Sequence, residues 1–305
     1  MEHHRHHHPQ AGPGPGPGDS DGAGAAALAE LLDLDAEVLH CYLSGVTAWV
    51  HELAAGRSPR RILDLGSGTG TGALALARRF TEAGIIAVDM SAELLGHLAD
   101  KARAAGVAGR IHAVQADLDA GWPDVGSVDL VWASASLHHL SDPDRVLAGV
   151  LAALSPGGLL AVAELDSFPR FLPGDPGRSP GDPAGPGPGS LAGLEARCHA
   201  ALAAGLAGEV PHLGGDWGPR LSRAGFTIEA ERHFGIDLSP PLPAAAGRYA
   251  QASLRRMRSG LGGQISAGDL AALDALIDGD GPGGVLQRED LTVRAARTVW
   301  VARRP

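Results

Sequence analysis

The stretch Asp64-Leu65-Gly66-Ser67-Gly68-Thr69-Gly70-Thr71-Gly72 decides the fold, because it places a glycine-dense turn between an apolar strand and a helix. We predict the strand over residues 61–65 and the helix over residues 73–80. Glycine permits positive φ and lets a ligand lie against bare backbone, while the first turn of a helix supplies free amides. The turn therefore predicts a nucleotide-type cofactor site. The alternative is a tight strand-to-helix turn that binds nothing.

The chain around this turn alternates strands and helices. Further apolar strands are predicted at residues 84–88, 111–114, 128–132 and 159–163, with helices at 91–105 and 143–154 between them. Asp142 and Pro143 mark the start of the second of these helices, because aspartate caps free amides and proline suits the first helical position. Five strands linked by helices predict an α/β fold with a parallel sheet covered on both faces.

Two acids follow the next strands. Asp89 ends the second strand, 19 residues after Gly70, where a carboxylate can accept both hydroxyl protons of a ribose. The alternative for Asp89 is an acid that simply precedes the helix near Ser91. Asp117 follows the third strand, where it could accept a hydrogen bond from an adenine amino group, although alone it would be a surface acid.

In this order the pieces resemble the class I S-adenosylmethionine-dependent methyltransferases of the small-molecule type. The resemblance covers about residues 60–165. Within that range it extends to the segments Asp129 to Leu140 and Leu154 to Gly158. It implies a Rossmann-like, doubly wound, mostly parallel sheet of seven strands whose last strand is antiparallel. It also implies S-adenosylmethionine as cofactor, held by residues at the ends of the first four strands: Asp64, Gly66, Ser67, Gly68 and Gly70 at the methionine end, Asp89 at the ribose with Met90 next to it, Asp117 with Leu118 at the adenine, and Ala133 at the start of the stretch 133–137 that borders the methyl group.

The domain organisation follows from composition and from the resemblance. Residues 1–24 are rich in His, Pro and Gly and are predicted to be a disordered tail, to which we assign no functional metal site. Residues 25–58 are predicted to form an N-terminal helical cap, and residues 59–305 the methyltransferase domain. Within that domain we expect a flexible loop at 172–190 and a helical insertion at about 242–278.

Two histidines are candidates for the catalytic base. A phenol, or an amine that arrives protonated, needs a base near pH 7, and histidine has the matching pKa. His138 and His139 come just after the fourth strand, beside the place where the family holds the transferable methyl. We take His138 as the better candidate. The alternative is that one histidine packs or caps the neighbouring helix while the other faces water.

Charge and cysteine content limit the partners. The net charge of −10 argues against nucleic acid and anionic membrane surfaces and favours a small-molecule acceptor. Cys41 and Cys198 make no disulfide framework, and no basic start followed by an apolar stretch opens the chain, so we expect a cytoplasmic protein. The sequence sets neither the acceptor atom nor the oligomeric state.

Two other functions are consistent with the sequence. A nicotinamide-dependent oxidoreductase is one, because Gly68 to Ala73 also satisfies the G-x-G-x-x-A pattern of dinucleotide sites. Asp64 and Asp117 favour the methyltransferase instead, since a dinucleotide site needs neither acid. A binding protein that keeps the cofactor pocket without turnover is the other.

Overall fold

The computed structural model describes residues 17–174, 189–208 and 210–305. Most of the predicted tail, with its histidines, and most of the predicted loop 172–190 therefore lie outside the described residues. None of the helices in the described ranges combines the length and the apolar character needed to cross a membrane.

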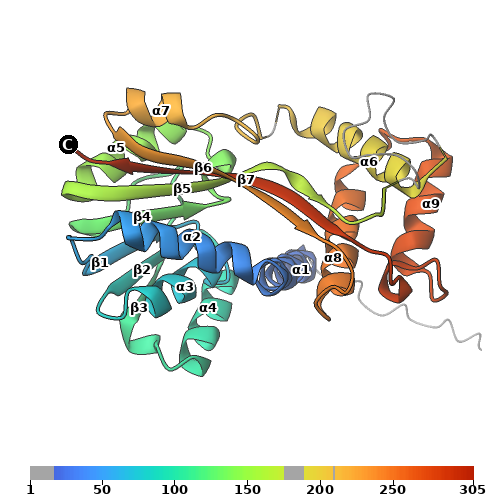
Figure 1. Cartoon of the computed structure of the whole chain (residues 1–305), viewed down its shortest axis with the longest axis horizontal. Helices are drawn as coiled ribbons and strands as arrows, with labels where there is room; N and C mark the ends of the chain where they lie inside the picture. The colour runs from blue at the N-terminus through green and yellow to red at the C-terminus, as the bar shows by residue number, and fades with distance from the viewer. Residues whose placement is uncertain (1–16, 175–188, 209) are drawn as a thin grey trace, which may run out of the picture.

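A seven-stranded sheet in the order β3-β2-β1-β4-β5-β7-β6 forms the centre of the fold (Figure 1). Strands β1 to β5 pair in parallel, and β7 is antiparallel to both β5 and β6. The predicted sheet with an antiparallel last strand is confirmed. The strands are β1 (Arg61–Leu65), β2 (Gly84–Asp89), β3 (Ile111–Gln115), β4 (Val128–Ser134), β5 (Leu154–Arg170), β6 (Thr227–Leu238) and β7 (Val293–Arg303).

Successive side chains of a strand point to opposite faces of the sheet, and here both sets are apolar. Helices therefore cover both faces. Ile62 of β1 packs in one buried cluster with α2 (His40–Leu53), α3 (Thr71–Arg79) and α4 (Ala92–Ala104). Its neighbour Leu63 packs on the opposite face with α5 (Pro143–Ala153) and α7 (Gly218–Arg223). As predicted, the Asp142 side chain caps α5 by accepting a hydrogen bond from the Arg145 amide at 3.1 Å.

A second apolar core lies where β5, β6 and β7 continue beyond the other strands. There α1 (Pro17–Val38), α6 (Leu191–Leu206), α8 (Ala246–Gly260) and α9 (Ala267–Asp278) pack around the strand ends. Figure 1 shows α6, α8 and α9 gathered at that end, with α1 crossing between them and α2. The helices α8 and α9 occupy the segment for which we predicted a helical insertion.

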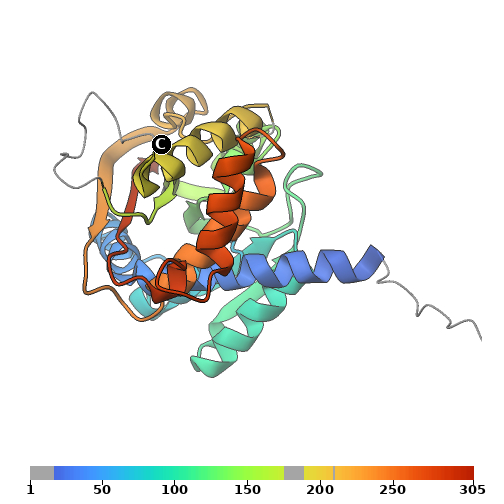
Figure 2. The same ribbon diagram turned by 90° about the vertical axis from the view of Figure 1, so that its right-hand side faces the viewer.

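Two boundaries differ from the sequence-based prediction. Helix α1 begins at Pro17, inside the segment predicted to be disordered, and its first turns extend from the body of the molecule (Figure 2). The alanine-rich run favours a helix, and Leu34 and Val38 anchor its far end in the second core. Strand β5 runs on to Arg170 because it stays paired with β7 as far as Arg294.

Candidate active site

The glycine turn lies between the chain that follows β4 and helix α1. Gly66 has φ +66°, and a Cβ atom on it would come within 2.4 Å of Ser136 Cβ. Gly68 has φ +52°, and a Cβ there would lie 3.0 Å from Leu32 Cδ1 on α1. Both the backbone conformation and the close approach therefore require glycine at Gly66.

Asp89 is tied directly to the glycine turn. Its Oδ2 accepts a hydrogen bond from the Gly68 amide at 2.8 Å, and its Oδ1 accepts one from the Ser91 amide at 2.9 Å. Each carboxylate oxygen can accept a further hydrogen bond, since it has two lone pairs. Met90 follows with 67% of its surface exposed, which is unusual for a large apolar side chain. The end of β2 thus presents an acceptor group and an apolar surface side by side.

Asp64 lies beneath the start of α3 and is only 2% exposed. Burial raises its pKa to about 7, although a hydrogen bond from the Ala73 amide acts in the opposite direction. Among the described residues, neither Asp64 Oδ2 nor the nearby Trp132 Nε1 has a hydrogen-bond partner. Asp64 therefore supports the first turn of α3 from inside the protein, and its carboxylate does not reach the surface of the glycine turn.

The other predicted cofactor residues fall in three environments. Asp117 is exposed, and its Oδ1 accepts a hydrogen bond from the Asp119 amide at 2.9 Å. Leu118 is half-buried against the apolar core on the α5 face. Ala133 is fully buried in that same core, which makes its side chain unavailable to a cofactor at the strand ends.

His138 is buried, at 4% exposure, in the short helix η2 (Leu137–His139). Its Nδ1 lies 2.5 Å from Oε2 of Glu164, at the point where β5 passes the end of β4. The other carboxylate oxygen of Glu164, Oε1, accepts hydrogen bonds from the amides of Ser136 at 3.2 Å and Leu137 at 2.8 Å. One carboxylate therefore holds the whole turn that follows β4.

The His139 ring packs against the His138 ring with centroids 4.1 Å apart. Partial burial, and secondly the His138 ring, lower the pKa of His139 to about 4, so His139 is neutral at pH 7. The structure brings both predicted histidines together beside Ser136, whose side chain lies against Gly66.

Helix α1 is fastened to the glycine turn by a contact that sequence reasoning missed. Asp33 Oδ1 accepts a hydrogen bond from Thr69 Oγ1 at 2.6 Å and pairs with Lys101 Nζ at 2.5 Å. Lys101 also donates to Thr69 Oγ1 at 3.1 Å. The three side chains come from α1, the turn and α4, so nothing local in the sequence indicated that they meet.

A buried polar cluster on the β7 side was also missed. Asp35 Oδ1 accepts hydrogen bonds from Arg297 Nη2 and from the Tyr249 hydroxyl, both at 2.6 Å. The Arg297 guanidinium lies 4.9 Å from the centroid of the Tyr42 ring, and burial raises the pKa of Tyr42 to about 12. Arg297 pairs with Leu165 across the sheet, one residue beyond Glu164. The cluster therefore joins α1, α2 and α8 to the sheet close to the Glu164 carboxylate.

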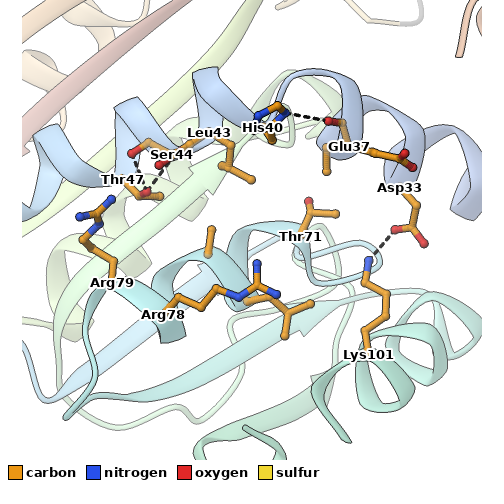
Figure 3. Close-up of a pocket in the computed structure, with 13 residues that line it drawn as sticks. Asp33, Glu37, His40, Leu43, Ser44, Thr47, Thr71, Arg78, Arg79 and Lys101 are labelled. Atoms are coloured by element: carbon orange, nitrogen blue, oxygen red, sulfur yellow. Dashed lines mark hydrogen bonds and ion pairs between the residues drawn. The ribbon is translucent and has the colours of Figure 1, made fainter. Parts of the chain in front are cut away.

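A groove of about 740 Å³ lies nearby, between α2 and α3 (Figure 3). The ion pair of Asp33 with Lys101 stands at one end, and Arg78 and Arg79 stand at the other. None of the residues predicted to hold the cofactor lines this groove, so it is a separate surface feature.

The central part of the chain is similar to known proteins. Residues 62–158 match the family model described as a methyltransferase domain. A malonyl-[acyl-carrier protein] O-methyltransferase of Laribacter hongkongensis is 40% identical over 113 residues, which is 35% of this chain and 38% of that protein. The ubiquinone/menaquinone biosynthesis C-methyltransferase of Vibrio vulnificus is 35% identical over 124 residues, which is 40% of this chain and 47% of that protein. The chain thus spans less than half the length of these curated relatives.

Solved structures agree on the fold. A Bacillus halodurans protein provisionally described as a methyltransferase superposes with a TM-score of 0.53 at 16% identity and covers 85% of this chain and 98% of its own. The YcgJ protein of Bacillus subtilis gives a TM-score of 0.50 at 15% identity, over 84% of this chain and 97% of its own.

Proposed function

We propose that this chain, whose residues 62–158 match a methyltransferase domain, is a class I enzyme that transfers a methyl group from S-adenosylmethionine to a small-molecule acceptor. The observation that carries the proposal is the contact between Asp89 and Gly68, which joins the end of β2 to the glycine turn at 2.8 Å. This contact sets a hydrogen-bond acceptor for a ribose beside bare backbone, within a sheet of methyltransferase topology.

The residues at this edge fit an adenosyl sulfonium. Ser67 Oγ is buried and lacks a partner among the described residues, so it is available to a polar ligand. Met90 offers an apolar surface for the adenine, and the oxygens of Asp89 can accept from ribose hydroxyls. We assign the methionine end to the turn, with Asp64 acting through α3 and not by direct contact. The residues that would hold the cofactor are Gly66, Ser67, Gly68, Gly70, Asp89, Met90, Asp117 and Leu118.

The residues of the protein itself would remove a proton from the acceptor and orient it. When bound, S-adenosylmethionine supplies an electrophilic methyl group on a sulfonium, whose transfer creates little new charge for the protein to stabilise. We propose that His138 takes the proton of a hydroxyl or amine acceptor and that His139 supports its ring. The net charge of −10 and the name of the ubiquinone/menaquinone biosynthesis C-methyltransferase support a small organic acceptor, and the two cysteines outside any disulfide spacing support a cytoplasmic location.

Calorimetry and a transfer assay test this function. Isothermal titration with S-adenosylhomocysteine should give saturable binding, whereas NADH should give none. Binding of NADH alone would contradict the proposal and favour a nicotinamide-binding protein. A labelled-methyl assay against a panel of phenols, amines and carboxylic acids then separates an enzyme from a binding protein that has no turnover.

A further inference from the structure

We propose that Glu164 is a positioning residue of this site, which holds His138 as the tautomer protonated on Nδ1 and leaves the Nε2 lone pair to take the acceptor proton. This inference rests on the proposed function, because that function identifies the proton as the one lost by the methyl acceptor. In the transfer, the bond from acceptor to methyl forms as the methyl–sulfur bond breaks, the sulfur keeps the electron pair, and the acceptor proton passes to Nε2.

The hydrogen-bond pattern around Glu164 fixes which nitrogen carries the proton. Glu164 is 2% exposed, and its two oxygens face the Ser136 and Leu137 amides and His138 Nδ1. Amides can only donate, so they favour the ionised carboxylate, which can only accept. Nδ1 of a neutral His138 must then be the donor, and the lone pair resides on Nε2.

The turn itself is held in a strained conformation that Glu164 helps to maintain. Ala135 has φ +50°, a conformation that a residue with a Cβ seldom adopts. Its amide donates to the Ala163 carbonyl at 2.8 Å, directly before Glu164 in β5. Such strain persists only where surrounding contacts determine the conformation, and it occurs most often at functional sites. The contacts of β5 thus determine where the His138 ring lies.

The second ring nitrogen is the one left for chemistry. His138 Nε2 makes no hydrogen bond to a described residue, and it is not among the fully buried atoms without a partner. Within the described part of the chain, the charged and titratable groups around the two rings are Glu164, His139 and, from α8, Arg256. His139 is neutral at pH 7, so Glu164 is the group that orients His138.

Glu195 provides a matched control elsewhere in the fold. It is a buried carboxylate on α6 whose Oε1 accepts hydrogen bonds from the amides of Phe171 at 2.6 Å and Leu172 at 3.4 Å. Its Oε2 lies 3.8 Å from Nη2 of Arg294, and none of its partners among the described residues is a histidine. Replacing Glu195 with glutamine measures the general effect of neutralising a buried carboxylate that holds backbone amides.

The test is nitrogen-15 NMR of the imidazole rings in the full chain, with the His138 signals assigned from their absence in H138Q. In the wild type we expect Nδ1 protonated and Nε2 unprotonated at pH 8. In E164Q the amide oxygen stays on the backbone amides and the NH₂ group faces Nδ1, so the tautomer should reverse. E195Q should leave the His138 signals unchanged. A wild-type His138 protonated on Nε2, or an unchanged tautomer in E164Q, would overturn the proposal.

Kinetics with an acceptor from the panel complete the test. E164Q should lower kcat by about 100-fold and remove the limb of the pH profile that reports the base, while S-adenosylhomocysteine affinity changes by less than about threefold. An unchanged pH profile would limit Glu164 to a structural role. If the wild type fails to bind S-adenosylhomocysteine, the proposed function fails, whereas the tautomer of His138 is still decided without any cofactor.

Discussion

The carboxylate of Asp89 accepts the backbone amide of Gly68 at 2.8 Å, so a side chain at the end of β2 sets the shape of the turn that follows β1. The same carboxylate accepts the Ser91 amide and thereby fixes its own direction at the start of α4. Cofactor affinity should therefore depend on Asp89 in two ways, through the shape of the turn and through direct hydrogen bonds.

Replacing Asp89 with asparagine tests both effects. Its NH₂ group cannot accept from one of the two amides, and a charged acceptor for ligand hydroxyls is lost. We expect S-adenosylhomocysteine binding to weaken by about 1.5–3 kcal/mol, which is about 10- to 150-fold in Kd. Calorimetry measures this, and D124N, which changes an exposed acid away from the turn, is the control. Equal affinity in D89N and wild type would contradict the assignment.

Gly66→Ala should disturb the turn more than any change of charge. The added Cβ would meet Ser136 Cβ at 2.4 Å in a backbone conformation with φ +66°. We expect a loss of about 1–3 kcal/mol in the free energy of unfolding, measured by urea denaturation, together with loss of cofactor binding.

Two further variants separate the clash from the backbone strain. Gly56 also has positive φ, +89°, but a Cβ there meets nothing within 4 Å, so G56A reports strain alone. Combining G66A with S136G removes the clash and should recover part of the lost stability. Strictly additive effects of the two substitutions would show that Gly66 and Ser136 do not interact.

Much of the fold was accessible from the sequence because its signals are local. The glycine turn, the cap formed by Asp142 and the alternation of strands each depend on a few consecutive residues, and the structure confirms the sheet and the capped helix. Strand periodicity also contained the information that Ala133 faces the core, since it follows the buried Val131 on the same face. The family resemblance led us to assign it to the cofactor instead.

The contacts that complete the site were not accessible in this way. Arg297 and Asp35 are 262 residues apart in the sequence. Glu164 meets His138 only because the pairing of β4 with β5 sets Ser134 opposite Ala163. A buried arginine and a surface arginine look alike in a single sequence. The polar contacts of the site therefore depend on pairs of residues far apart in the sequence, which no local sequence pattern encodes.

The pKa of Asp64 predicts a definite dependence of stability on pH. Burial raises this pKa from 3.8 in the unfolded chain to about 7 in the folded protein, so between these values the folded state binds more protons than the unfolded state. This carboxyl group therefore makes the free energy of unfolding fall as pH rises from about 4 to 7, by at most about 4 kcal/mol. The D64N variant should lack that fraction of the pH dependence and be more stable than the wild type at pH 8, as measured by urea denaturation at each pH. Parallel curves for D64N and wild type would show that Asp64 ionises normally.

The cluster of Asp35, Arg297 and Tyr249 should behave as one unit in unfolding. Arg297 is buried, so removing its partner in D35N leaves a poorly solvated cation. In R297M, Asp35 keeps the Tyr249 hydroxyl as its side-chain partner among the described residues. We expect each single change to cost about 2–4 kcal/mol in the free energy of unfolding, discounted for the partial exposure of Asp35. The double variant D35N/R297M should cost less than the sum of the two, because no unpaired charge then remains.

Urea denaturation measures this coupling, provided that the m value is unchanged. The Y249F variant should lose about 1–2 kcal/mol in the free energy of unfolding, because it lacks one hydrogen bond. If the double variant lost the full sum, Asp35 and Arg297 would contribute to stability independently of each other.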